Sequence, residues 1–274
     1  MAMRVLAFVF GISLSMLFLA CAGDETTKPG EQDIEKTAAT LDLTATATAD
    51  YFDMSALSLA VGQLLPGLGK AATPPETLRV STCPLIIFDR SAKQVTLDFD
   101  GGCQAADGVT RSGTINLSYS GSLRSSATLT LTFNNFSAHG YTYSGQVVIS
   151  VNNGAVTVAL ENAAITDARG QTTRLAGTFA VKAAIGKPLD FSDDVYLAGG
   201  SLIVTDKDGK RYNFTITEDL EITLTCAHPR KGKMEGTSSD GVAVKVDFFP
   251  ADGGCDDLAV ITIGGVTREI HLGE

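Results

Sequence analysis

The spacing of apolar residues changes from a helical period to strict alternation near Leu78. Beyond that point apolar and polar residues alternate, as half-buried β-strands do. The clearest runs are Thr128–Phe133, Val147–Val151, Val156–Leu160, Phe214–Thr217, Ile222–Thr225 and Val244–Phe248. The connections between them are short and rich in Gly, Asn and Asp, so neighbouring strands are expected to be antiparallel.

The number of such runs predicts about ten to twelve strands, more than one twisted sheet carries comfortably. We therefore expect an all-β, mainly antiparallel fold, built as a two-layer sandwich, a roll or an open barrel. One short helix is predicted near residues 51–65, where Met54, Leu57, Val61, Leu64 and Leu65 recur at helical spacing. Asp50 or Asp53 would cap its N-terminus, and its apolar stripe would pack on the sheet.

The first twenty residues have the pattern of an export signal. Val5–Ala20 is an uncharged apolar run that follows Arg4, and it is short for a membrane-spanning helix. Phe18-Leu19-Ala20-Cys21 resembles the lipobox of bacterial lipoproteins, although Phe18 and Leu19 depart from its usual residues. The resemblance implies cleavage before Cys21 and lipid attachment to that cysteine.

Two other outcomes of the leader remain open at this stage. Ala20-Cys21-Ala22 also suits ordinary signal peptidase, which would release a soluble secreted protein, and an uncleaved leader would act as a membrane anchor. If Cys21 carries the lipid, two or three acyl chains such as palmitate would hold the protein on a membrane. Ala22, in place of Asp, resembles an outer-membrane address in bacteria with two membranes.

These features divide the chain into three parts. Residues 1–20 form the lipoprotein signal peptide, and residues 21–46 are polar and Thr-rich, as a flexible tether is. Residues 47–274 form the β-rich domain, including the short helix. With the leader removed, the formal net charge of −10 becomes −11, because the leader carries Arg4. Such a protein is repelled by nucleic acid, so the expected partners are a membrane through the lipid and an unknown envelope protein or ligand.

Four cysteines remain once Cys21 is set aside, and an even number in an exported chain indicates two disulfides. Three pairings are possible. We favour Cys83–Cys103 and Cys226–Cys255, because each pair is nearest in sequence and the two segments, 83–103 and 226–255, are alike. Closing each loop would stabilise the fold by about 3 kcal/mol.

An internal repeat surrounds these cysteines. Val95–Cys103 and Val244–Cys255 both contain a strand ending in Asp-Phe followed by D-G-G-C, and each is preceded by a Thr-Cys pair. The paired glycines are expected to adopt positive φ and turn the chain tightly. The run D-F-D-G-G-C-x₄-G-x-x-R-x-G over Asp98–Gly113 looks like a family of uncharacterised exported lipoproteins of bacteria. That resemblance implies anchoring and β structure, and it implies no activity.

Candidate catalytic and metal-binding residues are sparse. The three histidines, His139, His228 and His271, are far apart, and none has a metal-ligand spacing. The pairs Asp98/Asp100 and Asp206/Asp208 faintly resemble calcium loops but are better explained as turns. His139, Tyr141 and Tyr143 alternate and share one strand face, which suits cross-strand packing better than sugar stacking.

The leading hypothesis is a non-enzymatic, lipid-anchored envelope protein with a structural or interaction module and no cofactor, metal or catalytic residue. A second is a carrier for an apolar ligand, which needs a cavity of roughly 300 Å³ or more. A third is a carbohydrate-active enzyme with paired carboxylates about 5–9.5 Å apart. Its candidates are Asp98/Asp100, Asp193-Asp194 and Asp256-Asp257.

Overall fold

The computed structural model describes residues 30–65, 76–79, 83–105, 107–184, 194–248 and 254–272. Within them lie one helix, α1 (Glu31–Gly62), and fifteen strands of a single antiparallel sheet. The strands are β1 (Thr77–Arg79), β2 (Leu85–Asp89), β3 (Gln94–Asp98), β4 (Cys103–Gln104), β5 (Thr110–Gly121), β6 (Ser126–Ala138), β7 (Tyr141–Asn152), β8 (Ala155–Thr166), β9 (Thr172–Ala184), β10 (Val195–Thr205), β11 (Arg211–Ile222), β12 (Lys231–Ser238), β13 (Ala243–Asp247), β14 (Leu258–Ile263) and β15 (Val266–His271).

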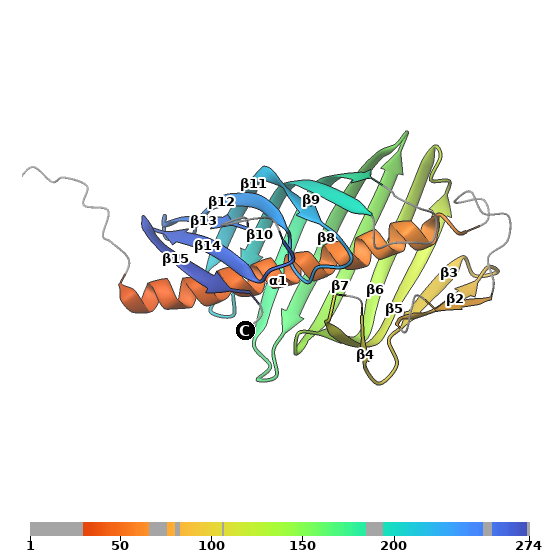
Figure 1. The fold of residues 1–274 in the computed structure, drawn as a ribbon, viewed down its shortest axis with the longest axis horizontal. Coiled ribbons are helices and arrows are strands. Elements are labelled where there is room, and N and C mark those ends of the chain that lie inside the picture. Colours follow the sequence, from red (N-terminus) through yellow and green to blue (C-terminus); the bar gives the residue numbers. More distant parts are fainter. Residues whose placement is uncertain are drawn as a thin grey trace, which may run out of the picture.

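The sheet is a simple meander, in which spatial order follows chain order from β1 to β15 and only β4 lies off the path, paired with β5. The predicted all-β, antiparallel fold with one helix is confirmed, and the sheet is open rather than closed. The structure is not a sandwich of two sheets, because all the described strands belong to one sheet. The described strands instead form one curved sheet, and α1 lies against its inner face (Figure 1).

The helix is the centre of the hydrophobic core. It crosses the strands obliquely along the length of the molecule (Figure 1), and it contacts β6, β7 and β11 as well as β14 and β15 near the end of the sheet. Every residue from Thr44 to Gly62 is buried, whichever way its side chain points. A helix buried on all sides needs no apolar stripe, so its sequence carries only a weak amphipathic signal.

Two predictions about this helix are wrong. It begins at Glu31, so residues 31–46, expected to belong to the tether, are helical, and residues 21–29 lie outside the described part of the chain. Asp50 and Asp53 lie in mid-helix and do not cap it, because Gly30 occupies the N-cap position. The helix is longer than expected because several of its threonines and serines donate hydrogen bonds to backbone carbonyls within the helix, so these polar residues can be buried.

Three of these hydroxyls illustrate the point. The Oγ1 atoms of Thr44 and Thr48 donate to the carbonyl oxygens four residues earlier, at 2.6 Å in both cases. Ser55 Oγ donates to Tyr51 O in the same way, at 2.7 Å. These three hydroxyls are therefore satisfied within the helix, whereas Thr46 Oγ1 and Ser58 Oγ are buried without a hydrogen-bond partner.

The sheet bends around the helix along a row of bulges in β5 to β8. The register shifts at Gly145 on β7, opposite Asn162 on β8, and both residues have positive φ, 91° and 51°. A Cβ at Gly145 would lie 2.3 Å from Asn162 O, so only glycine fits there. The hydroxyl of Tyr51 on α1 lies 3.1 Å from Ser144 O and 3.2 Å from Ala164 O, where the ladder is interrupted. The helix thus supplies a donor at the bend of the sheet.

Both predicted disulfides, Cys83–Cys103 and Cys226–Cys255, are present, with Cα–Cα distances of 5.9 and 5.1 Å. Of the two glycines expected to turn the first segment, Gly102 has a φ of 130° but Gly101 does not have positive φ, and the other positive φ of this turn belongs to Asp100, at 53°. Gly253 of the second segment lies outside the described residues.

The leader also lies outside the described residues. Within residues 30–65, the only part of the chain described as helical, α1 lacks the sustained apolar character that crossing a membrane requires.

Candidate functional site

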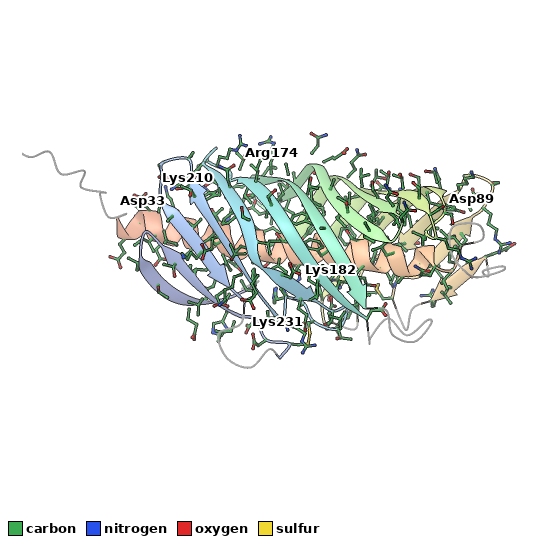
Figure 2. All side chains as sticks on the ribbon, turned by 90° about the horizontal axis from the view of Figure 1, so that it is seen from above. Asp33, Asp89, Arg174, Lys182, Lys210 and Lys231 are labelled. Carbon is green, nitrogen blue, oxygen red and sulfur yellow. A yellow bond between two sulfur atoms is a disulfide. The ribbon has the colours of Figure 1, made fainter. Side chains whose placement is uncertain are left out.

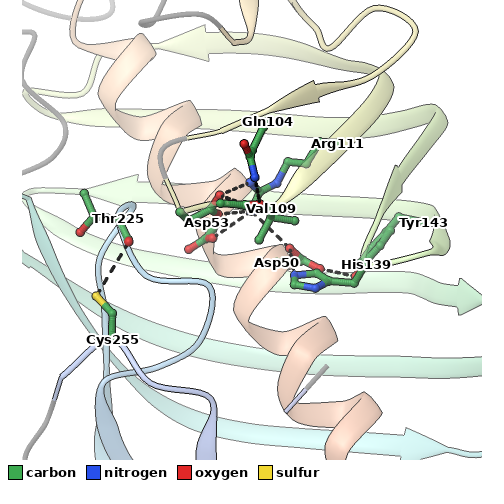
Figure 3. A network of polar contacts seen from close by, with 11 residues as sticks. Asp50, Asp53, Gln104, Val109, Arg111, His139, Tyr143, Thr225 and Cys255 are labelled. Carbon is green, nitrogen blue, oxygen red and sulfur yellow. Dashed lines mark hydrogen bonds and ion pairs between the residues drawn. The ribbon is translucent and has the colours of Figure 1, made fainter. Parts of the chain in front are cut away.

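A cluster of buried charged side chains interrupts the apolar core where α1 passes β5 (Figure 3). Asp50 and Asp53 project from α1 toward Arg111, whose side chain is only 2% exposed. Arg111 Nη2 lies 3.4 Å from Asp50 Oδ1 and 3.3 Å from Asp53 Oδ2. The cluster therefore ties the helix to the sheet through a guanidinium group that water does not reach.

Asp107, in the turn before β5, completes the surroundings of Arg111. Its Oδ1 accepts a hydrogen bond from Arg111 Nη1 at 2.9 Å, and its Oδ2 lies 2.7 Å from Arg111 Nη2. Asp107 Oδ1 also accepts from the backbone N–H of Val109 at 2.9 Å, which fixes the turn. Such two-point contacts between guanidinium and carboxylate are the strongest and most directional ion pairs in proteins.

Asp50 also contacts two residues of the β6 to β7 hairpin. The hydroxyl of Tyr143 donates to Asp50 Oδ2, and His139 Nε2 lies 3.7 Å from Asp50 Oδ1. Burial raises the pKa of Asp50 above its ordinary value, and Arg111, His139 and Tyr143 act against that rise. Burial raises the pKa of Tyr143 as well, so the phenol stays protonated and donates.

The electrostatics of the cluster favour a proton on Asp53. Burial raises the pKa of Asp53 well above its ordinary value, and the attraction of Arg111 only partly offsets this. Its Oδ1 has no hydrogen-bond partner. Burial acts to lower the pKa of Arg111, but its bond with Asp107 and the other carboxylates outweigh that effect, so the net change is upward. The guanidinium stays charged, and the group can act as a fixed positive centre rather than as an acid or base.

Beside this cluster lies a surface hollow of about 420 Å³. It is lined by the turn before β5, by the β6 to β7 turn, and by the segment between β11 and β12, residues 223–230, which we call the strap. The strap is bound through Cys226 to Cys255, so the second disulfide segment of the internal repeat lies at this hollow. The residues that line the hollow are Asp107, Gly108, Val109, Thr110, His139, Gly140, Ala227, His228 and Leu272.

His228 is one of two buried polar residues of the strap, with Thr223. Burial, followed by the proximity of His139, lowers the pKa of His228 to about 4. The ring is hydrogen-bonded to the backbone of Leu272, and its Nδ1 has no partner. The His139 and His228 ring centroids lie 5.8 Å apart. The structure thus brings together two histidines that their separation in sequence gave no reason to associate.

A second hollow, of about 480 Å³, lies between the first turns of α1 and the turns that join β8 to β9, β10 to β11 and β12 to β13; we call it the groove. Figure 2 shows its two sides at one end of the molecule, with Asp33 of α1 near Lys210. Lys210 pairs with Asp240 at 2.8 Å and lies 5.6 Å from the centre of the Tyr212 ring. The charged and aromatic lining residues are Asp33, Lys36, Asp42, Tyr141, Asp167, Asp206, Lys207, Asp208, Lys210, Tyr212 and Asp240.

The aspartates considered for glycoside chemistry do not form one site. Asp98 ends β3, Asp194 precedes β10, and Asp256 precedes β14, strands that are not neighbours in the sheet. Asp194 is buried and accepts a hydrogen bond from Tyr196 at 3.2 Å. Asp193 lies outside the described residues.

The remaining acidic candidates have structural roles that their positions explain. Asp98 Oδ1 accepts from Asp100 N at 2.8 Å, and Asp206 Oδ1 accepts from Asp208 N at 2.9 Å, as in ordinary turns. Asp257 pairs with His271 at 3.2 Å, and its pKa is lowered chiefly by that contact.

An apolar ligand has little room beside the helix in the described structure. A hollow between α1 and strands β8 and β9, lined by residues such as Phe52 and Phe179, has essentially no volume that even a water molecule could occupy. Ligand cavities of proteins usually begin near about 300 Å³. The rings of Phe52 and Phe179 pack edge to face at 4.8 Å, so aromatic contacts occupy the space that a carrier would leave open.

Among the residues that the structure describes, no group of three or more His, Cys, Asp and Glu side chains is arranged to hold a metal ion. The chain matches no family model, no curated protein and no solved structure. The site therefore has to be interpreted from its own geometry.

Sequence reasoning missed Asp107 and Arg111 as partners of the helix. Their spacing of four residues within the D-G-V-T-R run was a usable signal, since opposite charges so placed around a tight turn can pair. Nothing in the local sequence indicated that Asp50 and Asp53 would reach them.

Proposed function

We propose that this chain is an exported, lipid-anchored protein of the cell envelope whose β domain is a non-enzymatic interaction module. Ala22 after Cys21 favours the outer membrane as its location. The two disulfides are compatible with an exported protein, because such bonds persist in oxidising compartments. The anchor is proposed on the sequence around Cys21, with the apolar run directly before it.

The proposal that the domain is not an enzyme rests on one observation, namely that α1 fills the space inside the curved sheet (Figure 1). Residues 44–62 of α1 are buried on every side, and the charged groups among them are bonded to Arg111 and Tyr143. The side chains of Asp50 and Asp53 are 1% and 3% exposed. Recognition is therefore assigned to the surface of the domain.

The groove is the surface that fits this role best. Six aspartates and three lysines line it, so its charge favours a basic partner segment. Tyr141 lies at its edge, and burial together with Asp42 and Asp167 raises the pKa of that phenol. We propose a basic segment of another envelope protein as the partner, held by carboxylates and by the face of Tyr141.

Site-specific crosslinking in the membrane-bound protein tests this assignment. A photoreactive residue at Ala39, an exposed position lining the groove, is expected to give a discrete crosslinked product. The matched control is position 182, where the lysine side chain is 79% exposed on the outer face of β9. A product at position 39 that is absent at 182 supports the proposal, and equal labelling or none at both positions contradicts it.

Fractionation of cells tests the anchor separately. The wild-type chain is expected in the membrane fraction, resistant to high salt and released by detergent. The Cys21→Ser variant is expected to leave that fraction or to remain unprocessed with its leader. A Cys21→Ser protein that is processed and still sediments with membranes would contradict lipid anchoring.

A further inference from the structure

The hollow beside the charged cluster brings two imidazole rings from distant parts of the sheet into one place. His139 is in the turn between β6 and β7, and His228 is in the strap between β11 and β12. Their ring centroids are 5.8 Å apart, their planes are inclined by 33°, and both rings line the same hollow. His139 also connects this hollow to the cluster of buried charges, because its ring contacts Asp50.

His228 presents a nitrogen without a partner. The residue is 7% exposed, and its Nδ1 is buried and makes no hydrogen bond. The ring is bonded to the backbone of Leu272, so Nε2 is the nitrogen that carries the hydrogen and donates. Nδ1 then holds an unused lone pair. A buried acceptor without a donor is costly, so such an atom commonly marks a place where a ligand or ion binds.

His139 lies beside a carboxylate. Its Nε2 is 3.7 Å from Asp50 Oδ1, too far for a hydrogen bond, and has no other partner, which leaves Nδ1 as the nitrogen that a ligand can use. Histidines that bind metals generally direct their second nitrogen to a carboxylate or a backbone carbonyl. His228 has such a partner in the backbone of Leu272, and Nε2 of His139 faces the Asp50 carboxylate without bonding to it.

The charges nearby favour a cation. Asp107 lines the hollow, and Asp50 and Asp107 together place two carboxyl groups against the one guanidinium of Arg111, with Asp53 favouring its neutral form. Imidazole nitrogen selects borderline transition metals over Ca²⁺ or Mg²⁺, which prefer oxygen. The four cysteines of the domain are in disulfides, so thiolates of the folded domain do not compete for the ion.

We propose that His139 and His228 together bind one divalent transition-metal ion of the Zn²⁺ and Cu²⁺ class. Water in the hollow completes the coordination, because the chain supplies two nitrogens and not the three or four ligands of a permanent structural site. The site is therefore an exchangeable one. It is independent of the proposed anchor and of the groove, so the failure of either leaves this proposal unaffected.

Titration of the purified protein with Zn²⁺ tests the site. The protein should keep both disulfides and carry no polyhistidine tag, and the expected stoichiometry is one ion per chain. The variants His139→Asn and His228→Gln should each weaken binding by about 10-fold to 100-fold. Asparagine is chosen because position 139 has a φ of 51°, which asparagine tolerates, and glutamine can keep a donor toward Leu272.

The third histidine provides the matched control. His271 has a side chain that is 53% exposed and paired with Asp257, so His271→Asn should leave Zn²⁺ affinity within about twofold of wild type. Equal weakening by all three variants, weakening by His271→Asn alone, or the absence of saturable binding would overturn the proposal.

Electron paramagnetic resonance of the wild-type protein with Cu²⁺ gives a readout that does not depend on the folding of a variant. The expected spectrum has hyperfine structure from two imidazole nitrogens on one ion. A spectrum with one nitrogen, or with oxygen ligands only, would show that the two rings do not share the ion and would contradict the proposal.

Discussion

Arg111 Nη2 lies 2.7 Å from Asp107 Oδ2, and the same guanidinium reaches Asp50 and Asp53 on the buried helix. One side chain of β5 thus joins a surface turn to the centre of the core. Because all four side chains are nearly inaccessible to water, the arrangement depends on the mutual compensation of their charges.

Replacement of Arg111 by methionine should destabilise the domain by about 3–5 kcal/mol, because it leaves three carboxyl groups buried without their cation. Urea unfolding with both disulfides intact measures the loss. The control is Arg268→Met, since Arg268 pairs with the exposed Glu35 and such a pair contributes about 0–1 kcal/mol. Equal losses in the two variants would contradict the assigned role of Arg111.

Replacement of Tyr143 by phenylalanine should cost about 1–3 kcal/mol, because the ring still packs but Asp50 loses its hydroxyl donor. Tyr119→Phe, at a half-buried position of β5 outside the cluster, should change the free energy of unfolding by less than about 0.5 kcal/mol. The comparison separates the hydrogen bond from the loss of a hydroxyl in general. No difference between the variants would argue against the bond to Asp50.

The two acidic partners of Arg111 should respond differently to amide substitution. Asp53→Asn should cost less than about 1 kcal/mol at neutral pH, because the raised pKa of Asp53 already favours its neutral form. Asp107→Asn should cost about 1.5–3 kcal/mol, because it removes a charged acceptor from two bonds to Arg111. Thermal or urea unfolding of both variants at the same pH checks the order, and the reverse order would contradict it.

His228 should make the domain less stable as the pH falls from about 6.5 to about 4. The folded-state pKa is below the ordinary value, so in this window the unfolded chain binds a proton that the folded chain does not. The loss should approach about 3 kcal/mol in total. Asp50 and Asp53 act in the opposite sense, since their raised pKa values give stability that is lost as pH rises above about 3.8.

The contribution of His228 can be isolated by difference. Urea unfolding of wild type and His228→Gln at pH 7, 5.5 and 4 measures it, because the carboxylates titrate alike in both proteins. The gap between the two proteins should change in favour of the variant as the pH falls. A constant gap would show that the His228 ring titrates normally in the folded state.

The sequence carried enough information for the strands, the turns and the two disulfides. Alternation along the strands and Gly or Asn at many of the turns are local signals, and the nearest cysteines proved to be the bonded ones. The length of α1 could not be predicted from such local signals. Its buried threonines, serines and alanines give no amphipathic stripe, because neighbours surround it on all sides.

The candidate sites could not have been assembled from local patterns. Asp50, Arg111, His139 and His228 belong to four separate segments, and they meet only because the meander curls around the helix. Of the alternating residues His139, Tyr141 and Tyr143, only the two tyrosines lie on β7, because His139 belongs to the turn before it. The side chains of His139 and Tyr143 nevertheless both contact Asp50. What local sequence could not supply was the buried helix that they face.

Intact-mass analysis of the protein isolated from its native membranes tests the central claim of the account most directly. A polypeptide that begins at Cys21 and carries the additional mass of acyl chains is the predicted result. A chain that begins at Gly23 without modification would contradict lipid anchoring and would identify a soluble secreted protein.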